Sequence, residues 1–198
     1  MPLSRDIPAK VKEALRREAG YGCCICGNPV IQYHHIVDWS VRKHHEPIHM
    51  MVLCVEHHYM VTHGAIDQDD QYSHKANPVN IKNGYTKGLL VAPKNQPVID
   101  AGQTQIIGDE LSLSIDGKTV LGLRYNNGQV FITAANYDVK GRKTLSIADN
   151  EWLLSSLGRW DVKASYQRLE VHDRVRKEIV LILDMKVYPF KLRCSLKN

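Results

Sequence analysis

The chain has 198 residues, 43% hydrophobic and 24% charged, a composition that excludes a disordered chain and indicates a soluble globular protein. It contains no run of about 18 apolar residues and no apolar stretch of signal-peptide length at its start, so we expect no membrane association and a cytoplasmic location. The 26 basic residues exceed the 21 acidic ones, which is compatible with a polyanionic partner without requiring one.

The spare positive charge and the metal-binding residue types lie in different halves of the chain. Up to Asp100 there are 11 basic and 10 acidic residues, whereas after it there are 15 and 11. Nine of the ten histidines fall between His34 and His74, and four of the five cysteines precede Val55. In a cytosolic chain this clustering favours metal binding over disulfides.

The first part of the chain predicts short helices and strands. Apolar positions at helical spacing, Pro8 near the start and Gly20 at the end predict a helix over 7–20. A turn-rich stretch follows, then a β-branched run, a polar loop, a second apolar run and a helical pattern. We expect these as a strand over 30–37, an irregular loop over 38–47, a strand over 48–54 and a helix over 55–65.

The second part of the chain predicts antiparallel β structure. Residues 77–103 are rich in Asn, Pro, Gly and Gln and predict a connection without regular structure. We therefore expect an α+β protein with an N-terminal domain over 1–90, a linker over 91–103 and a β-rich domain over 104–198. Asp116-Gly117 and Asn127-Gly128 are hairpin signals within about seven to nine strands. This domain could position a substrate, dock a partner or form a homodimer.

Two pairs of metal-ligand residues have the spacing of a structural zinc site. Cys23 and Cys26 form a C-x2-C pair in a turn, and Cys54 and His57 form a C-x2-H pair before a helix. Two such pairs can supply the four ligands of a tetrahedral zinc ion. Two alternatives stay open: Cys24 could replace Cys23 with C-x-C geometry, and these could be ordinary buried cysteines.

The motifs CCICG (23–27), YHHIV (33–37), MMVLC (50–54) and VEHH (55–58), in this order and spacing, resemble an HNH endonuclease of the zinc-containing bacterial and phage type. The segment KANPVNIKNGYTKGLL resembles an extension found in a subgroup of these proteins. The resemblance covers about residues 10 to 91. It implies a ββα-metal, or His-Me finger, fold with structural Zn²⁺.

The resemblance also implies a role for each matching histidine. His34 corresponds to a ligand of the catalytic metal, His35 to the general base and His58 to a second metal ligand. His63 is the candidate for a further ligand, although it lies five residues beyond His58 where the family has a spacing of four. His49 stands where the family usually has an asparagine, so it could tether the loop, or instead become a metal ligand or a catalytic group that orients the base.

The implied reaction is hydrolysis of a phosphodiester bond to a 5′-phosphate and a 3′-hydroxyl, with DNA as the expected substrate. The cofactors would be a divalent ion (Mg²⁺, Mn²⁺, Ni²⁺ or Zn²⁺) at the catalytic site and the structural Zn²⁺. Two other classes stay open: a non-catalytic nucleic-acid-binding module and a partner-binding protein on the same fold. Adjacent strand residues face opposite ways, so we expect His34 and His35 to serve different partners.

The loop after the histidine pair is the candidate nucleic-acid contact. It carries Arg42 and Lys43 next to His44 and His45, and a solvated loop is the plainer interpretation. Because the loop would lie close to the metal, we consider contact with backbone phosphates. We interpret the aromatic residues of the β half as packing residues. We interpret the run RVRKE (174–178) as a solvated turn.

Overall fold

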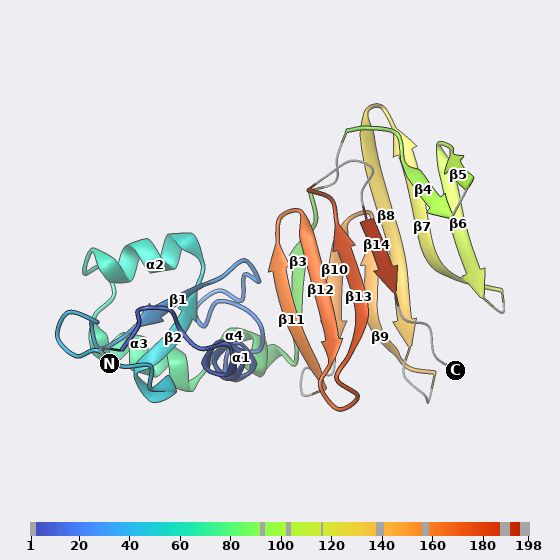
Figure 1. Cartoon of the computed structure of the whole chain (residues 1–198). Coiled ribbons are helices and arrows are strands. Elements are labelled where there is room, and N and C mark those ends of the chain that lie inside the picture. The colour runs from blue at the N-terminus through green and yellow to red at the C-terminus, as the bar shows by residue number, and fades with distance from the viewer. Residues whose placement is uncertain are drawn as a thin grey trace. The chain divides into compact units, whose positions relative to one another are not determined.

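The computed structural model describes residues 3–91, 94–101, 104–115, 117–137, 141–155, 159–186 and 191–194. The chain forms two compact units. Unit 1 comprises residues 1–86 and 157–162, and unit 2 comprises residues 87–156 and 163–198. Both units contain antiparallel sheets, and the helices of the described residues precede residue 84, so the chain is a mixture of helix and antiparallel sheet (Figure 1).

Unit 1 places two short antiparallel strands between helices. Its elements are α1 (Ala9–Glu18), β1 (Gln32–His35), the 3-10 helix η1 (Pro47–His49), β2 (Met50–Leu53), α2 (Val55–Thr62), α3 (Gln68–Ala76) and α4 (Val79–Asn83). The register pairs His34 with Met51 and His35 with Met50. The histidine pair therefore lies at the end of β1 next to the start of β2.

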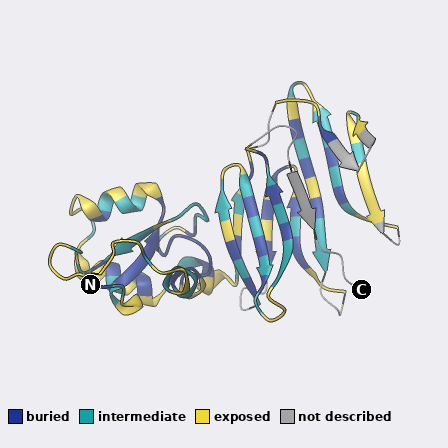
Figure 2. Ribbon diagram, viewed as in Figure 1, coloured by how far each residue is buried: buried dark blue, intermediate teal, exposed yellow. Residues whose placement is uncertain are grey.

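The core of unit 1 is centred on β2, all four residues of which are buried (Figure 2). Leu15 of α1, Ala19 just after it and Val61 of α2 belong to the same buried cluster, and both helices contact β2. A strand that is covered on both faces has a continuous run of apolar residues instead of an alternating pattern, and the sequence MMVL of β2 is such a run. This packing holds α2 beside the strand pair.

Two helices of unit 1 differ from the sequence-based expectation. The structure has α3, a polar helix that the sequence pattern did not predict, and α4, which lies in the segment expected to be irregular. Helix α3 begins at Asp67, whose side chain accepts a hydrogen bond from the backbone N–H of Asp70. Helix α4 ends at Gly84, which is in the left-handed conformation.

Antiparallel strands make up unit 2, and two of them, β3 and β11, begin in residues that belong to unit 1. The strands from residue 85 onward are β3 (Tyr85–Leu89), β4 (Val98–Ala101), β5 (Thr104–Ile107), β6 (Glu110–Ile115), β7 (Lys118–Asn126), β8 (Gln129–Tyr137), β9 (Lys143–Ala148), β10 (Glu151–Ser155), β11 (Trp160–Ser165), β12 (Arg168–Asp173), β13 (Glu178–Asp184) and β14 (Lys191–Cys194). They form sheets in the orders β3-β10-β9-β8-β7-β6, β11-β12-β13-β14 and β4-β5. Strand β4 replaces part of the linker expected over 91–103.

The turn signals of the β half explain part of this order. Asn127 and Gly128 both have positive φ and join β7 to β8, as a two-residue hairpin turn requires. Asp116 of the other signal lies outside the described residues, while its flanking strands β6 and β7 pair. Among the helices of the described residues, each is too short or too polar to cross a membrane.

Candidate metal centre and histidine site

Four ligand-type side chains of unit 1 converge although they come from two separate segments. Their ligand atoms all lie within 4.8 Å of one another. We call this group the Cys3His cluster: Cys23, Cys26, Cys54 and His57. Cys54 is the residue that precedes α2, so its thiol lies 3.2 Å from Nδ1 of His57 in the first turn. The cluster could hold a metal ion.

Two thiols of the Cys3His cluster, those of Cys23 and Cys26, occupy an environment that opposes their ionisation when no cation is present. Cys26 is an exposed residue, but its thiol is partly covered by the cluster, and this desolvation raises its pKa to about 12, with the nearby Cys23 adding to the shift. Burial also raises the pKa of Cys23. A bound cation reverses this balance, because it stabilises thiolates directly. Cys24 is buried and lies outside the cluster, so the C-x-C alternative does not describe the geometry.

The turn that carries the first two cysteines is packed against the side chain of Asn80 from α4. Asn80 is buried, and its Nδ2 donates to the carbonyl oxygens of Gly20 and Gly27, each at 3.1 Å. A Cβ on Gly27 would lie only 2.3 Å from Oδ1 of Asn80. The segment expected to be an irregular connection therefore buttresses the cysteine turn.

His34 faces the helices. Its ring meets the ring of His58 edge to face, with centroids 5.1 Å apart. Its Nε2 donates to Oε1 of Gln71 on α3 at 3.1 Å. Burial lowers the pKa of His34 to about 4, and the neighbouring His58 contributes; burial also lowers the pKa of His58. Both rings are thus held neutral, the form that binds metal ions.

His35 faces the loop over 37–46. Its Nε2 donates to the backbone carbonyl of His44 at 3.0 Å, and its ring lies beside the rings of Trp39, His44 and His45. No described residue makes a hydrogen bond with its Nδ1. Burial lowers the pKa of His35, and the positive charge of Arg5 is among the further contributions. His34 and His35 therefore have separate sets of partners, as neighbouring strand residues should.

The loop is pinned by His44, which corrects the expectation of a surface contact there. His44 is 3% exposed, its Nε2 donates to the carbonyl of Val37 at 2.9 Å, and its Nδ1 accepts the N–H of Glu46 at 3.3 Å. This side chain is therefore closed to a nucleic acid. His49 instead bonds through Nδ1 to the hydroxyl of Tyr72 at 2.7 Å and contacts the ring of His44.

His63 does not join the pair formed by His34 and His58. It is exposed at the end of α2, where its ring stacks on Tyr59 with centroids 3.9 Å apart and its Nδ1 donates to the Tyr59 carbonyl at 2.9 Å. A spacing of five residues turns a side chain about 140° around a helix, which explains this direction. The structure thus brings together two of the three histidines considered for the catalytic metal.

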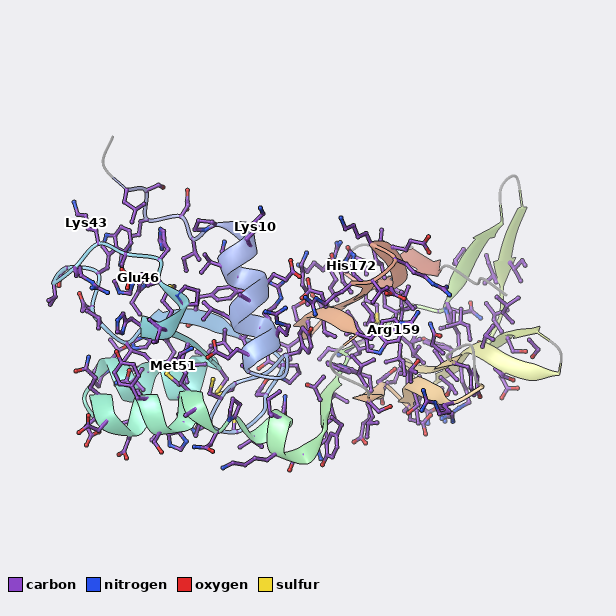
Figure 3. All side chains as sticks on the ribbon, turned by 90° about the horizontal axis from the view of Figure 1, so that it is seen from below. Lys10, Lys43, Glu46, Met51, Arg159 and His172 are labelled. Atoms are coloured by element: carbon purple, nitrogen blue, oxygen red, sulfur yellow. The ribbon has the colours of Figure 1, made fainter. Side chains whose placement is uncertain are left out.

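Of the remaining candidate contacts in the loop, Arg42 and Lys43 lie on the surface and His45 is half-buried. Arg42 and Lys43 are exposed, and Arg42 pairs with Glu46 at 2.9 Å. Figure 3 shows Lys43 at the outer side of the loop. His45 is half-buried, stacks on Trp39 and donates from Nε2 to the carbonyl of Ser4 at 2.8 Å. The loop thereby offers two exposed cations, and His45 attaches the N-terminal segment to it.

Comparison with protein families, with curated proteins and with solved structures found no match to the chain. The site must therefore be interpreted from its own geometry. Sequence reasoning missed two buried amides: Gln71, which contacts His34, and Asn80, which holds the cysteine turn through Gly20 and Gly27. The sequence did contain a signal for α3. Aspartate is a good residue to begin a helix, and Asp67 is followed by Gln71 and Lys75, which are spaced one helical turn apart.

Proposed function

We propose that the chain is a metal-dependent endonuclease of the HNH type that hydrolyses phosphodiester bonds in DNA. The observation that carries this proposal is the division of labour between His34 and His35. Nε2 of His34 bonds to Gln71 and its ring meets the ring of His58 edge to face, while Nε2 of His35 bonds to the carbonyl of His44 in the loop, so each ring keeps an Nδ1 without a hydrogen-bond partner among the described residues. A core that needed only packing has no use for two adjacent neutral imidazoles, each oriented by a carbonyl-type acceptor.

Zinc is the ion that the Cys3His cluster fits best. Zinc–sulfur bonds of about 2.3 Å at a tetrahedral angle place two sulfur atoms about 3.8 Å apart. The Sγ atoms of Cys26 and Cys54 are 3.8 Å apart, and Sγ of Cys23 is 3.7 Å from Nδ1 of His57. Four protein ligands leave no position for water, so this zinc ion has a structural role. It ties the cysteine turn to the start of α2.

His34 and His58 are the residues that would hold the catalytic ion. Metal–nitrogen bonds of about 2.1 Å meeting near a tetrahedral angle place two imidazole centroids about 5 Å apart, the separation found here. The described residues offer neither ring nitrogen of His58 a hydrogen-bond partner, so that side chain is free to bind. Mg²⁺, Mn²⁺, Ni²⁺ or Zn²⁺ would supply charge neutralisation at the phosphoryl and leaving oxygens.

His35 is assigned the role of general base. With its proton on Nε2 and donated to the carbonyl of His44, the ring has Nδ1 available to accept a proton from water. The lowered pKa keeps the ring neutral near pH 7. The water oxygen would then bond to phosphorus as the bond from phosphorus to the 3′ oxygen breaks. The leaving 3′ oxygen takes a proton from a solvent water, so the products are a 5′-phosphate and a 3′-hydroxyl.

The loop supplies positive charge for the phosphate backbone. Arg42 and Lys43 are the exposed cations of the loop, and Arg5 is an additional cation whose charge acts on His35. His44 has a positioning role instead, because its backbone carbonyl orients His35 while its ring holds the loop. Contacts of this kind bind phosphates without reading sequence.

The test is cleavage of supercoiled plasmid, single-stranded DNA and RNA with each of the four metal ions, and with EDTA as the metal-free control. We expect plasmid nicking that EDTA abolishes. His58→Ala should lower the rate about 100-fold, since it removes one of two protein ligands, while the matched control His63→Ala should change it by less than about threefold. Absence of cleavage with every substrate and metal would refute the proposal and favour a non-catalytic binding module.

A further inference from the structure

Gln71 has a buried side-chain amide whose NH₂ group and oxygen both form hydrogen bonds. It lies on α3, is 6% exposed, and has its Nε2 donating to the carbonyl of Ile66 at 3.2 Å. Its Oε1 accepts from Nε2 of His34 at 3.1 Å. An apolar residue of similar size would fill this position without the cost of burying an amide. The amide therefore has a purpose beyond filling space.

The contact with Ile66 determines the direction of the amide. A carbonyl oxygen can only accept a hydrogen bond, so the NH₂ end of Gln71 must face Ile66 and the oxygen must face His34. An oxygen there requires an N–H on Nε2 of His34. A neutral imidazole carries one proton, so Nδ1 of His34 is left with a free lone pair.

We propose that Gln71 is a positioning residue that holds His34 in the Nε2–H tautomer and so presents Nδ1 to the metal ion. This inference rests on the proposed function, in which His34 and His58 bind that ion. Metal-binding histidines generally donate their second ring N–H to an oxygen acceptor, which fixes both the tautomer and the ring orientation. Gln71 supplies that acceptor from a different helix than the one carrying His58.

The chain offers a matched control on the same helix. Gln68 also donates from its side chain to a backbone carbonyl, that of Ile36 at 3.0 Å, but it has no hydrogen bond with His34. Gln71→Leu and Gln68→Leu each remove one amide from α3, and only the first removes the acceptor for His34. Gln71→Glu keeps an oxygen that can accept the N–H of His34 but loses the hydrogen bond to Ile66, so it separates the two contacts of Gln71.

Two measurements test the inference on full-length protein with its Cys3His cluster loaded with zinc. Nitrogen-15 NMR of the histidine rings, without added Mn²⁺, should show the Nε2–H tautomer of His34 in the wild type, Gln68→Leu and Gln71→Glu, and a mixture in Gln71→Leu. The Mn²⁺ concentration for half-saturation, followed by calorimetry, should rise about 10- to 100-fold in Gln71→Leu and stay unchanged in Gln68→Leu.

A wild-type His34 in the Nδ1–H tautomer would overturn the inference, and so would unchanged tautomer and Mn²⁺ affinity in Gln71→Leu. The wild-type tautomer decides the matter even if Gln71→Leu does not fold. These readouts are separate from catalysis. A protein that shows the expected tautomer and Mn²⁺ affinities yet cleaves no nucleic acid would contradict the proposed nuclease and leave the role of Gln71 intact.

Discussion

Replacing Cys26 and Cys24 by alanine, one at a time, separates metal binding from packing. Cys26 is exposed and belongs to the Cys3His cluster, whereas Cys24 is 2% exposed and does not. Packing alone predicts that Cys24→Ala costs about 1 kcal/mol of unfolding free energy. It also predicts that Cys26→Ala costs less than about 0.5 kcal/mol, as surface substitutions usually do.

Metal binding reverses this order. A structural zinc ion contributes about 10–16 kcal/mol of apparent binding free energy, or about 3 kcal/mol for each of four ligands. We therefore expect Cys26→Ala to cost about 3 kcal/mol, to lose its zinc and to unfold at lower urea concentration than Cys24→Ala. Circular dichroism at 222 nm reports this, because the helices of the described residues all lie in unit 1. Mass spectrometry gives the zinc content.

The opposite ranking would refute the reasoning. If Cys24→Ala is the more destabilised variant, or if Cys26→Ala keeps one zinc ion per chain, the four side chains converge for packing and not for a metal. An equal loss of zinc from both variants would also contradict the geometry, because Cys24 lies outside the cluster.

Two further predictions concern stability. The pKa of His34 is lowered from 6.5 to about 4, so the stability that its neutral ring contributes is present above pH 6.5 and is lost as the pH falls toward 4. In His34→Phe, the drop in unfolding free energy between pH 7 and pH 5, measured by urea unfolding, should be about 2 kcal/mol smaller than in the wild type. An equal drop would contradict the burial of a neutral ring. Gly27→Ala should lower the unfolding free energy by about 2 kcal/mol or more, because its φ is +79° and the new Cβ meets Asn80. The control Gly64→Ala has φ +76° but lies in open space, so it should cost about 1 kcal/mol. Equal melting temperatures of the two variants would show that the side chain of Asn80 moves aside.

The sequence was most informative where chemistry depends on spacing along the chain. The C-x2-C and C-x2-H pairs predicted the four residues that converge, since a short turn and the first turn of a helix place such pairs locally. The opposite directions of His34 and His35 followed from the alternation of a strand. His63 was the candidate for a further ligand, but its ring stacks on Tyr59 instead, because a spacing of five residues turns a side chain about 140° around a helix.

The sequence was least informative about contacts between distant segments. Gln71 reaches His34, and Asn80 reaches the cysteine turn at Gly27, from helices that polar composition concealed. Tertiary packing, not an amphipathic pattern, stabilises such helices. His44 holds the loop because the path of the loop brings its ring to Val37 and Glu46. Such side chain to backbone hydrogen bonds leave no periodic signal.

The most direct test of the proposed nuclease is the initial rate of plasmid nicking by His35→Ala compared with His63→Ala, at equal zinc content and saturating Mn²⁺. The proposed base predicts a rate lower by about 10²- to 10⁴-fold in His35→Ala, and a rate within about threefold of the wild type in His63→Ala. An undiminished rate in His35→Ala would contradict the assignment of His35 and, with it, the division of labour between the two adjacent histidines.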